Sequence, residues 1–400
     1  MKKKSLLVLS LSTLLTFAQT APEYDKVIPL ENYNFVLGTQ GIGGFYKFTN
    51  ESALMEQAKH IRAMGSNILK ITLAKKSPKI YKLHSKKLNS TKELFLSHKD
   101  YKATFDMDFK YIFAWVHTLT KVEWKKGINK DDEKLLYDEM YEFANYLLTT
   151  YNNSGKTFLL GNWEGDWLLH KGYDRYMTPP KAHVKNMTKW FQIRQQAIDD
   201  AKKDTQHNNV ELYHYIELNL ALKGIKGETC IAKDILPKVN VDLVSYSSYE
   251  AIKKRNYQEK TQQLTEIFNY LEKQLKPKKE VPFTRRVFLG EYGYHANINK
   301  PQSFVKQYNE TKEIMEIGLE LNLPFVLHWQ MYNNEYNKKN GASKEMSLVN
   351  EQGKKTSLYF LHQNFYKIMN DYLKTFKTEN DTYPNQIEFN KKAVKILKDL

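Results

Sequence analysis

The chain has 400 residues, of which 41% are hydrophobic and 13% aromatic, so it can bury a sizeable core and is not a disordered segment. Its formal net charge of +16 invites a nucleic-acid partner, but only 6 of the 61 basic residues are Arg, the residue that phosphate and base readers favour. We therefore predict no nucleic-acid partner, while a modest attraction to acidic polysaccharides is compatible with the charge. The one cysteine, Cys230, excludes an intrachain disulfide and a cysteine-based metal cluster.

The first residues have the pattern of a secretory signal peptide. A positive start, "MKKK", precedes the apolar run "SLLVLSLSTLLTF", and Thr16 and Ala18 supply the small residues of a cleavage site. The apolar run is shorter than the roughly 20 residues that a spanning helix needs. We predict a signal peptide over residues 1–18, export to the periplasm or the medium, and no membrane insertion after its removal.

From residue 33 onward, short apolar runs alternate with long amphipathic ones. We predict eight strands, over 34–41, 67–73, 110–117, 157–162, 210–218, 241–248, 286–293 and 324–330. Helical spacing of apolar residues predicts the main intervening helices over 50–65, 132–151, 181–203, 258–275, 302–321 and 357–376. Eight βα units indicate a single (β/α)8 (TIM) barrel of the α/β class over residues 30–376. A doubly wound sheet is the alternative, but the glycines of "GTQGIGG" lack the nucleotide-binding spacing.

Two further segments need a place in this fold. Residues 75–109 form a long, Lys-rich excursion after strand two, which we expect near the top face of the barrel, with a helix over 91–105. The unit after strand five is weak, with a short helical pattern over 230–236. Residues 377–400 form a polar C-terminal tail with a possible terminal helix.

Functional groups of such barrels sit at the C-terminal ends of the strands. The polar and aromatic residues that fall there are Asn162, Trp163, Glu164 and Asp166 after strand four, Glu291 on strand seven, His328 and Trp329 on strand eight, Tyr246 on strand six, His117 on strand three, and Glu217 and Asn219 at the end of strand five. Carboxylates on strands four and seven lie on opposite sides of the central pit. One can protonate a leaving oxygen while the other attacks an anomeric carbon, which is the arrangement of retaining glycosidases.

The strand-four acid after an Asn, "VSYSSY" at strand six, "LGEYG" at strand seven and "HWQ" at strand eight resemble clan A of the glycoside hydrolases. The resemblance spans about residues 33–376 and implies a retaining (β/α)8 enzyme with a carbohydrate substrate. It implies that Glu164 is the acid/base and Glu291 the nucleophile. It also implies that Tyr246 hydrogen-bonds the nucleophile and that Trp329 lies under the sugar.

One departure from the clan pattern leaves the acid/base open. Trp163 intervenes between Asn162 and Glu164, whereas the clan has Asn directly before the Glu. Strict strand alternation puts Asn162 and Glu164 on one face, which favours Glu164, with Asp166 or Glu217 as alternatives. We further predict substrate contacts from Asn162, Asp166 and His117, and stacking platforms at Trp163 and Trp167. The histidines His117 and His328 are interpreted as hydrogen-bonding walls of the pit or as satisfied core histidines, in preference to metal ligands.

Other classes of function stay open. A carbohydrate-binding barrel without activity is compatible with the strand-four departure. A metal-dependent hydrolase barrel normally carries His-x-His on strand one, which here has neither His nor acid, and no GxSxG serine elbow occurs. We predict neither a metal nor an organic cofactor. A third, weaker alternative is a basic surface protein that binds anionic polymers.

Overall fold

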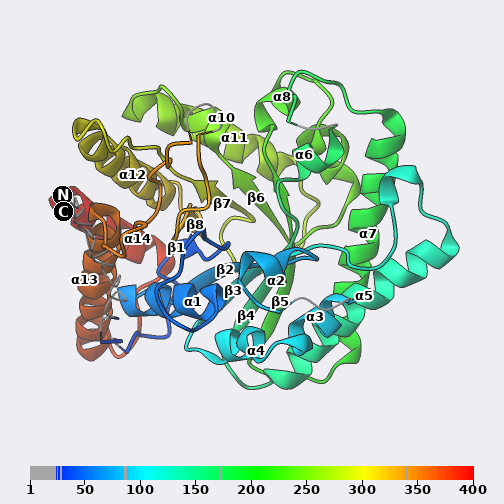
Figure 1. Ribbon diagram of the computed structural model, residues 1–400, viewed down its shortest axis with the longest axis horizontal. Coiled ribbons are helices and arrows are strands. Elements are labelled where there is room, and N and C mark those ends of the chain that lie inside the picture. The colour runs from blue at the N-terminus through cyan, green and yellow to red at the C-terminus, as the bar shows by residue number, and fades with distance from the viewer. Residues whose placement is uncertain (1–23, 25, 28, 85–87, 171–172, 338–340) are drawn as a thin grey trace, which may run out of the picture.

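The computed structural model describes residues 24–400 except 25, 28, 85–87, 171–172 and 338–340, so the predicted signal peptide lies outside the described residues. Eight parallel strands close into a barrel in sequence order, each hydrogen-bonded to the next and β8 to β1 (Figure 1). They are β1 (Leu37–Gln40), β2 (Ile68–Leu73), β3 (Tyr111–Val116), β4 (Thr157–Gly161), β5 (Glu211–Leu218), β6 (Leu243–Ser247), β7 (Val287–Tyr292) and β8 (Val326–His328). The predicted (β/α)8 barrel is confirmed.

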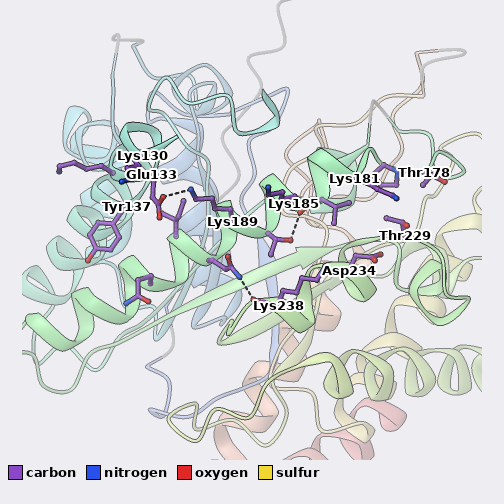
Figure 2. A pocket seen from close by; sticks show the side chains of 17 residues that line it. Lys130, Glu133, Tyr137, Thr178, Lys181, Lys185, Lys189, Thr229, Asp234 and Lys238 are labelled. Atoms are coloured by element: carbon purple, nitrogen blue, oxygen red, sulfur yellow. Dashed lines mark hydrogen bonds and ion pairs between the residues drawn. The ribbon is translucent and has the colours of Figure 1, made fainter. Parts of the chain in front are cut away.

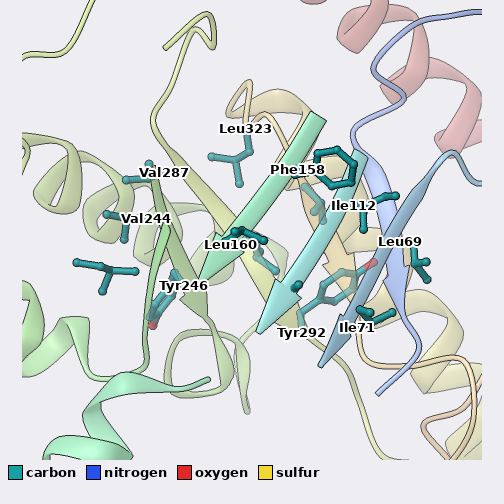
Figure 3. Packing of buried hydrophobic residues seen from close by; sticks show 14 of the residues in the cluster. Leu69, Ile71, Ile112, Phe158, Leu160, Val244, Tyr246, Val287, Tyr292 and Leu323 are labelled. Atoms are coloured by element: carbon teal, nitrogen blue, oxygen red, sulfur yellow. The ribbon is translucent and has the colours of Figure 1, made fainter. Parts of the chain in front are cut away.

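The apolar residues of the strands alternate between two separate clusters, to the inward one of which β1 contributes none. The outward residues, such as Leu69, Phe158 and Val244, pack under the surrounding helices (Figure 3). The inward residues form a largely aromatic plug, with Phe113 and Phe288 at a ring-centroid distance of 5.4 Å. Burying a large apolar side chain stabilises the fold by about 1.5–3 kcal/mol, so this plug makes the lower barrel a packed core.

The six long helices that cover the barrel are α1 (Ala53–Met64), α5 (Lys130–Thr150), α7 (Lys181–Asp204), α11 (Tyr257–Gln274), α12 (Gln302–Glu320) and α13 (Ser357–Asn380). Asn129 and Asn256 begin α5 and α11 as caps whose amides pair with the third helical residue. The loops carry short elements: α2 (Ser77–Ile80), η1 (Trp124–Lys126), α6 (Gly165–Leu169), α8 (Ala221–Ile225), α9 (Ile231–Asp234), η2 (Leu236–Lys238) and α10 (Tyr249–Ile252).

The excursion after β2 lies beside the barrel, not over its top face. It contains α3 (Thr91–Ser97) and α4 (Lys99–Asp106). Phe105 stacks on Phe158 of the outer β4 face at 5.6 Å, and Phe95 packs on Phe143 of α5 at 5.6 Å. The expectation of a top-face helix is therefore wrong for these two helices, because their buried aromatic rings fill the helical layer that the barrel requires between α1 and α5.

The C-terminal residues form helix α14 (Gln386–Asp399), capped by Asn385. Its apolar side buries Phe389 and Leu397 in the outer core, and the carbonyl of Leu400 accepts a hydrogen bond from Tyr308 of α12. Figure 1 shows α13 and α14 on the same flank of the barrel, next to α12. Among the described residues, no helix has the length and apolarity needed to cross a membrane.

Candidate active site

A buried ion pair crosses the inside of the barrel below its C-terminal rim. Lys70 of β2 donates to Oε2 of Glu217 on β5 at 2.7 Å, and both side chains are fully buried. Ser245 of β6 donates to the same oxygen at 2.9 Å. Strand alternation points all three inward, away from the helices. Removing either charge would leave the other buried and unpaired, so we expect the pair to be held rigidly.

Glu164 stands directly above this ion pair. β4 ends at Gly161, and the side chain of Asn162 exchanges two 3.0 Å hydrogen bonds with the backbone of Glu217. The chain then turns so that Glu164 has φ +23°, a region that non-glycine residues avoid. Its backbone N–H donates to Oε1 of Glu217 at 3.1 Å. Strain of this kind costs about 1–3 kcal/mol and persists only where the surroundings impose it.

The carboxyl group of Glu164 is held by two donors from neighbouring strands. Its Oε1 accepts from Asn219 at 2.6 Å and from Ser247 at 2.9 Å. Burial, and then repulsion from the Glu217 carboxylate, raise the pKa of Glu164 to about 7 despite these hydrogen bonds. Because Oε1 accepts both hydrogen bonds, the proton that Glu164 carries near neutral pH would lie on Oε2.

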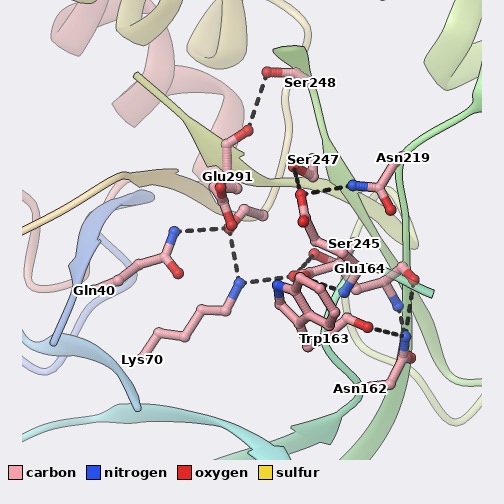
Figure 4. Close-up of polar contacts among 12 residues, drawn as sticks. Gln40, Lys70, Asn162, Trp163, Glu164, Asn219, Ser245, Ser247, Ser248 and Glu291 are labelled. Atoms are coloured by element: carbon pink, nitrogen blue, oxygen red, sulfur yellow. Dashed lines mark hydrogen bonds and ion pairs between the residues drawn. The ribbon is translucent and has the colours of Figure 1, made fainter. Parts of the chain in front are cut away.

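Glu291 faces the same pit from β7. The pairing of β6 with β7 shifts register between Tyr246 and Ser247, so that Glu291 lies opposite Ser247, and the Glu291 carbonyl accepts from the Ser248 N–H. Burial, followed by repulsion from Glu164, raises the pKa of Glu291 well above its ordinary value, while Lys70 and Tyr249 act in the opposite direction. Figure 4 shows both residues, with the contacts of the Glu164 carboxyl group to Asn219 and Ser247 and that of the Glu291 backbone carbonyl to Ser248.

Several buried polar atoms around these acids have no hydrogen-bond partner among the described residues. They are Oε2 of Glu291, the Tyr249 hydroxyl, and the indole nitrogens of Trp115 and Trp329. Tyr249 is close enough to Glu291 to lower its pKa, although their geometry falls outside that of an ordinary hydrogen bond. Buried polar groups are nearly always paired, so this group of free donors and acceptors indicates a place for a polar ligand.

Aromatic rings line the pit. Trp329, whose peptide bond to Gln330 is cis, lies with its ring centroid 6.1 Å from that of Trp115. The ammonium of Lys70 lies 4.4 Å from the Trp115 ring centroid. Trp163 is partly buried against the inward cluster and meets the exposed Tyr173 edge-on at 6.3 Å, and Trp167 also contacts Tyr173, at 5.7 Å. Indole faces suit the apolar faces of sugar rings.

Three predicted substrate contacts have other roles. Asp166 is fully buried and accepts from the backbone N–H groups of Asn219, Leu220 and Ile231. Asn162 is fully buried by its bonds to β5. Tyr246 lies on the outward face of β6 and donates to Glu250 at 3.2 Å, because alternation turns Ser245 and Ser247 inward instead. The predicted contacts of these three residues with the substrate or the nucleophile are corrected accordingly.

The two histidines differ. His328 is fully buried on the outward face of β8, between the rings of Tyr292 and His362 at 5.4 Å each, so it is a core histidine and not a wall of the pit. His117 follows the inward residue Trp115 by two positions at the end of β3, where burial and the nearby Arg194 lower its pKa to about 4. A neutral His117 can still take part in hydrogen bonds.

Sequence reasoning missed Lys70, Ser247, Asn219, Trp115 and Tyr249. One signal was available: Lys70 interrupts the apolar run "NILKITL" at an inward position, and a buried charge on a strand requires a partner. Asn219 was placed at the end of β5 but without a role. Nothing in the sequence pattern distinguished Tyr249 from Tyr246, because only the β6 register decides which of them faces the pit.

A groove of about 1180 Å³ lies elsewhere, on the outside of the barrel along α7, between α5 and η2 (Figure 2). It is lined by six lysines, Lys130, Lys134, Lys181, Lys185, Lys189 and Lys238, and by the acids Glu133 and Asp234. None of the pit carboxylates lines it. Cavity size therefore does not locate the chemistry, and we place the candidate site at the pit, where unpaired polar atoms and acids with raised pKa values converge.

Neither a known family profile nor a curated protein matches the sequence. Solved structures do match the fold. A variant of GH5_18 from Streptomyces cattleya, in complex with Manβ1-4GlcNAc, is 10% identical over 83% of this chain and 77% of its own, with a TM-score of 0.53. A GH5_18 from Bifidobacterium longum subsp. infantis is 10% identical over 79% and 73%, also with a TM-score of 0.53. At such identities, the likeness shows that this chain shares the barrel fold of these glycoside hydrolases.

Proposed function

We propose that the protein is a retaining glycoside hydrolase that uses Glu164 and Glu291. The observation that carries this proposal is that two buried acids, one after β4 and one on β7, face the same tryptophan-lined pit and both have raised pKa values, Glu164 adding to the rise for Glu291. Acids with perturbed pKa values in a polar pit are the usual mark of acid–base chemistry. The barrel fold shared with solved glycoside hydrolases supports the same conclusion.

We assign the shared proton to Glu164. The two acids titrate as a pair, and the working form of a retaining glycosidase has one proton between them. Glu164 lies against the Glu217 carboxylate, which disfavours a second negative charge there. Lys70 lowers the pKa of both acids and Glu217 raises both, but only at Glu291 does Lys70 outweigh Glu217, and there the Tyr249 hydroxyl also favours the anion.

In the first step, the Glu291 carboxylate attacks the anomeric carbon while Glu164 protonates the leaving glycosidic oxygen. The resulting glycosyl-enzyme ester is then hydrolysed by a water whose proton returns to Glu164. Oε2 of Glu291, which has no partner among the described residues, is the natural attacking oxygen. The reaction requires neither metal nor organic cofactor. We also propose that the enzyme acts after export, since its N-terminal residues have the signal-peptide pattern.

The test compares the wild type with Glu291→Gln and Glu164→Ala on aryl β-glycosides and polysaccharides. We expect both variants to lose about 10³-fold or more in kcat on polysaccharides, since each removes a whole catalytic step. Azide should restore turnover in Glu164→Ala on an aryl glycoside with a good leaving group and give a glycosyl azide of retained configuration. Equal activity of the wild type and Glu291→Gln would overturn the assignment. An inverted product from the wild type would overturn the retaining mechanism.

A further inference from the structure

The rim of the pit on its β6–β8 side carries an excess of positive charge. Lys253 follows α10, and its ammonium lies 5.4 Å from the ring centroid of Tyr249, the tyrosine beside Glu291. Arg255 donates to the carbonyls of Glu250 and Lys253 and so fixes this loop. Among the described residues, no carboxylate lies within ion-pair distance of the exposed Lys253 ammonium.

Two neighbouring loops add to this charge. Lys344, from the loop after β8, pairs with Glu335, and its carbonyl accepts from the N–H of Ala296 in the loop after β7. Partial burial of the His295 ring, next to Ala296, and then repulsion from Lys344 and Lys253 lower the pKa of His295. The pKa of Lys253 is likewise lowered by burial, then by Lys344 and Arg175. The lysines are thus near enough to repel one another.

The carboxylate of Glu335 balances only one of these cations. Glu335 forms an ion pair with Lys344, whereas Lys253 has no ion-pair partner among the described residues. Lys253 lies 5.4 Å from the ring centroid of Tyr249, whose pKa is raised by burial and then by Glu291, Glu335 and Glu164, so this charged rim adjoins the acids of the pit. Cations held together at the mouth of a pit lower the cost of bringing an anion there.

We propose that the substrate is an anionic polysaccharide whose carboxylate or sulfate groups bind Lys253 and Lys344, with His295 beside them. This inference rests on the proposed function for the reaction, and it adds the class of sugar. The negative groups would lie on the sugar unit at the rim, since the pit itself holds three glutamates and would repel them. A neutral His295 can still donate one hydrogen bond to an acidic group.

Binding tests this proposal independently of catalysis. The probes are polygalacturonate with its carboxyl-reduced, neutral form, and carrageenan with its desulfated form, each titrated into Glu291→Gln, which is expected to bind without turnover. In the rim variant, Lys253→Met and Lys344→Met are both added to Glu291→Gln. The matched control adds Lys130→Met with Lys185→Met in the α7 groove, which removes the same net charge away from the pit.

We expect at least one anionic polymer to bind about tenfold or more tightly than its neutral form, and the rim variant to lose about tenfold while the groove variant stays within about twofold. The two polymer pairs distinguish carboxylate from sulfate. Equal losses in the rim and groove variants, or no preference for either anionic form, would overturn the proposal. Rim-dependent binding with no hydrolysis by the wild type would uphold the anionic ligand and count against the glycosidase.

Discussion

The backbone N–H of Glu164 donates to Oε1 of Glu217 at 3.1 Å, while Oε2 of Glu217 accepts from Lys70 at 2.7 Å. One buried carboxylate thus joins the strained turn after β4 to the ion pair inside the barrel. We infer that Glu217 is a positioning residue. It holds Glu164 at φ +23° and, through its charge, keeps the proton on Glu164 up to higher pH.

Replacing Glu217 by Gln should shift the basic limb of the kcat/KM profile to lower pH. The change removes the negative charge that helps to raise the pKa of Glu164 to about 7, so Glu164 would lose its proton earlier. The variant should also lose about 3–5 kcal/mol of stability, because Lys70 is left buried without its partner. The pH profile and urea unfolding measure the two effects separately.

The double variant Lys70→Met with Glu217→Gln is the control, since it removes both buried charges. It should recover part of the stability, and its basic limb should move part of the way back, because Lys70 lowers the pKa of Glu164. A basic limb that stays near pH 7 in the single variant Glu217→Gln would show that the Glu217 charge does not tune Glu164.

Periodicity predicted the barrel because strand alternation and helix spacing are local properties. All eight strands fall within the predicted ranges, and Glu164 and Glu291 do reach the same pit. Strand ends near the rim were enough to select these two acids, since every strand of a barrel delivers its last residues to one face.

The misplaced residues depend on register and turns, which the sequence alone did not determine. Tyr246 and His328 lie on the outward faces of their strands, and a shift of one position would have turned each inward. Asp166 and Asn162 are tied to the backbone of β5 and its loop, 50 or more positions away along the chain. Local pattern carries no information on such a contact.

Replacing Glu164 by Gln should stabilise the protein at alkaline pH. The folded-state pKa of about 7 lies above the ordinary value of 4.5, so ionisation opposes folding, and the wild type loses stability as the pH rises from about 4.5 through 7. The loss amounts to about 3 kcal/mol, at 1.36 kcal/mol per pKa unit. Urea unfolding at pH 4 and pH 8.5 checks this: the variant should gain at pH 8.5 and not at pH 4. An equal gain in the free energy of unfolding at pH 4 and at pH 8.5 would show that ionisation of Glu164 is not its cause.

Replacing Tyr249 by Phe should move the acidic limb of the kcat/KM profile to higher pH. The Tyr249 hydroxyl lowers the pKa of Glu291, so its loss would favour the protonated, inactive form of that acid. We expect a drop in kcat/KM of about tenfold below pH 6. Tyr246→Phe is the matched control, because that hydroxyl donates to Glu250 outside the barrel and should leave the acidic limb in place. If Tyr246→Phe moved the acidic limb and Tyr249→Phe did not, Tyr246 would be the tyrosine that hydrogen-bonds the nucleophile, as the resemblance implies.

Replacing Asp166 by Asn should weaken the fold far more than the chemistry. The two carboxylate oxygens accept from three backbone N–H groups, and an amide offers one oxygen and turns an N–H toward the others. The amide N–H of the new Asn would then face a backbone N–H, and both donors would lack an acceptor. Such unpaired donors cost about 1–3 kcal/mol, so the free energy of unfolding should fall by that amount. The turnover of the folded fraction should stay within about tenfold of the wild type, because Asp166 makes no contact with Glu164 or Glu291 other than through Asn219. Glu164→Gln, measured alongside, should show the reverse pattern of full stability and lost activity. If Asp166→Asn instead kept its stability and lost its turnover, Asp166 would be the acid of the reaction, and Glu164 would have only a structural role in the turn after β4.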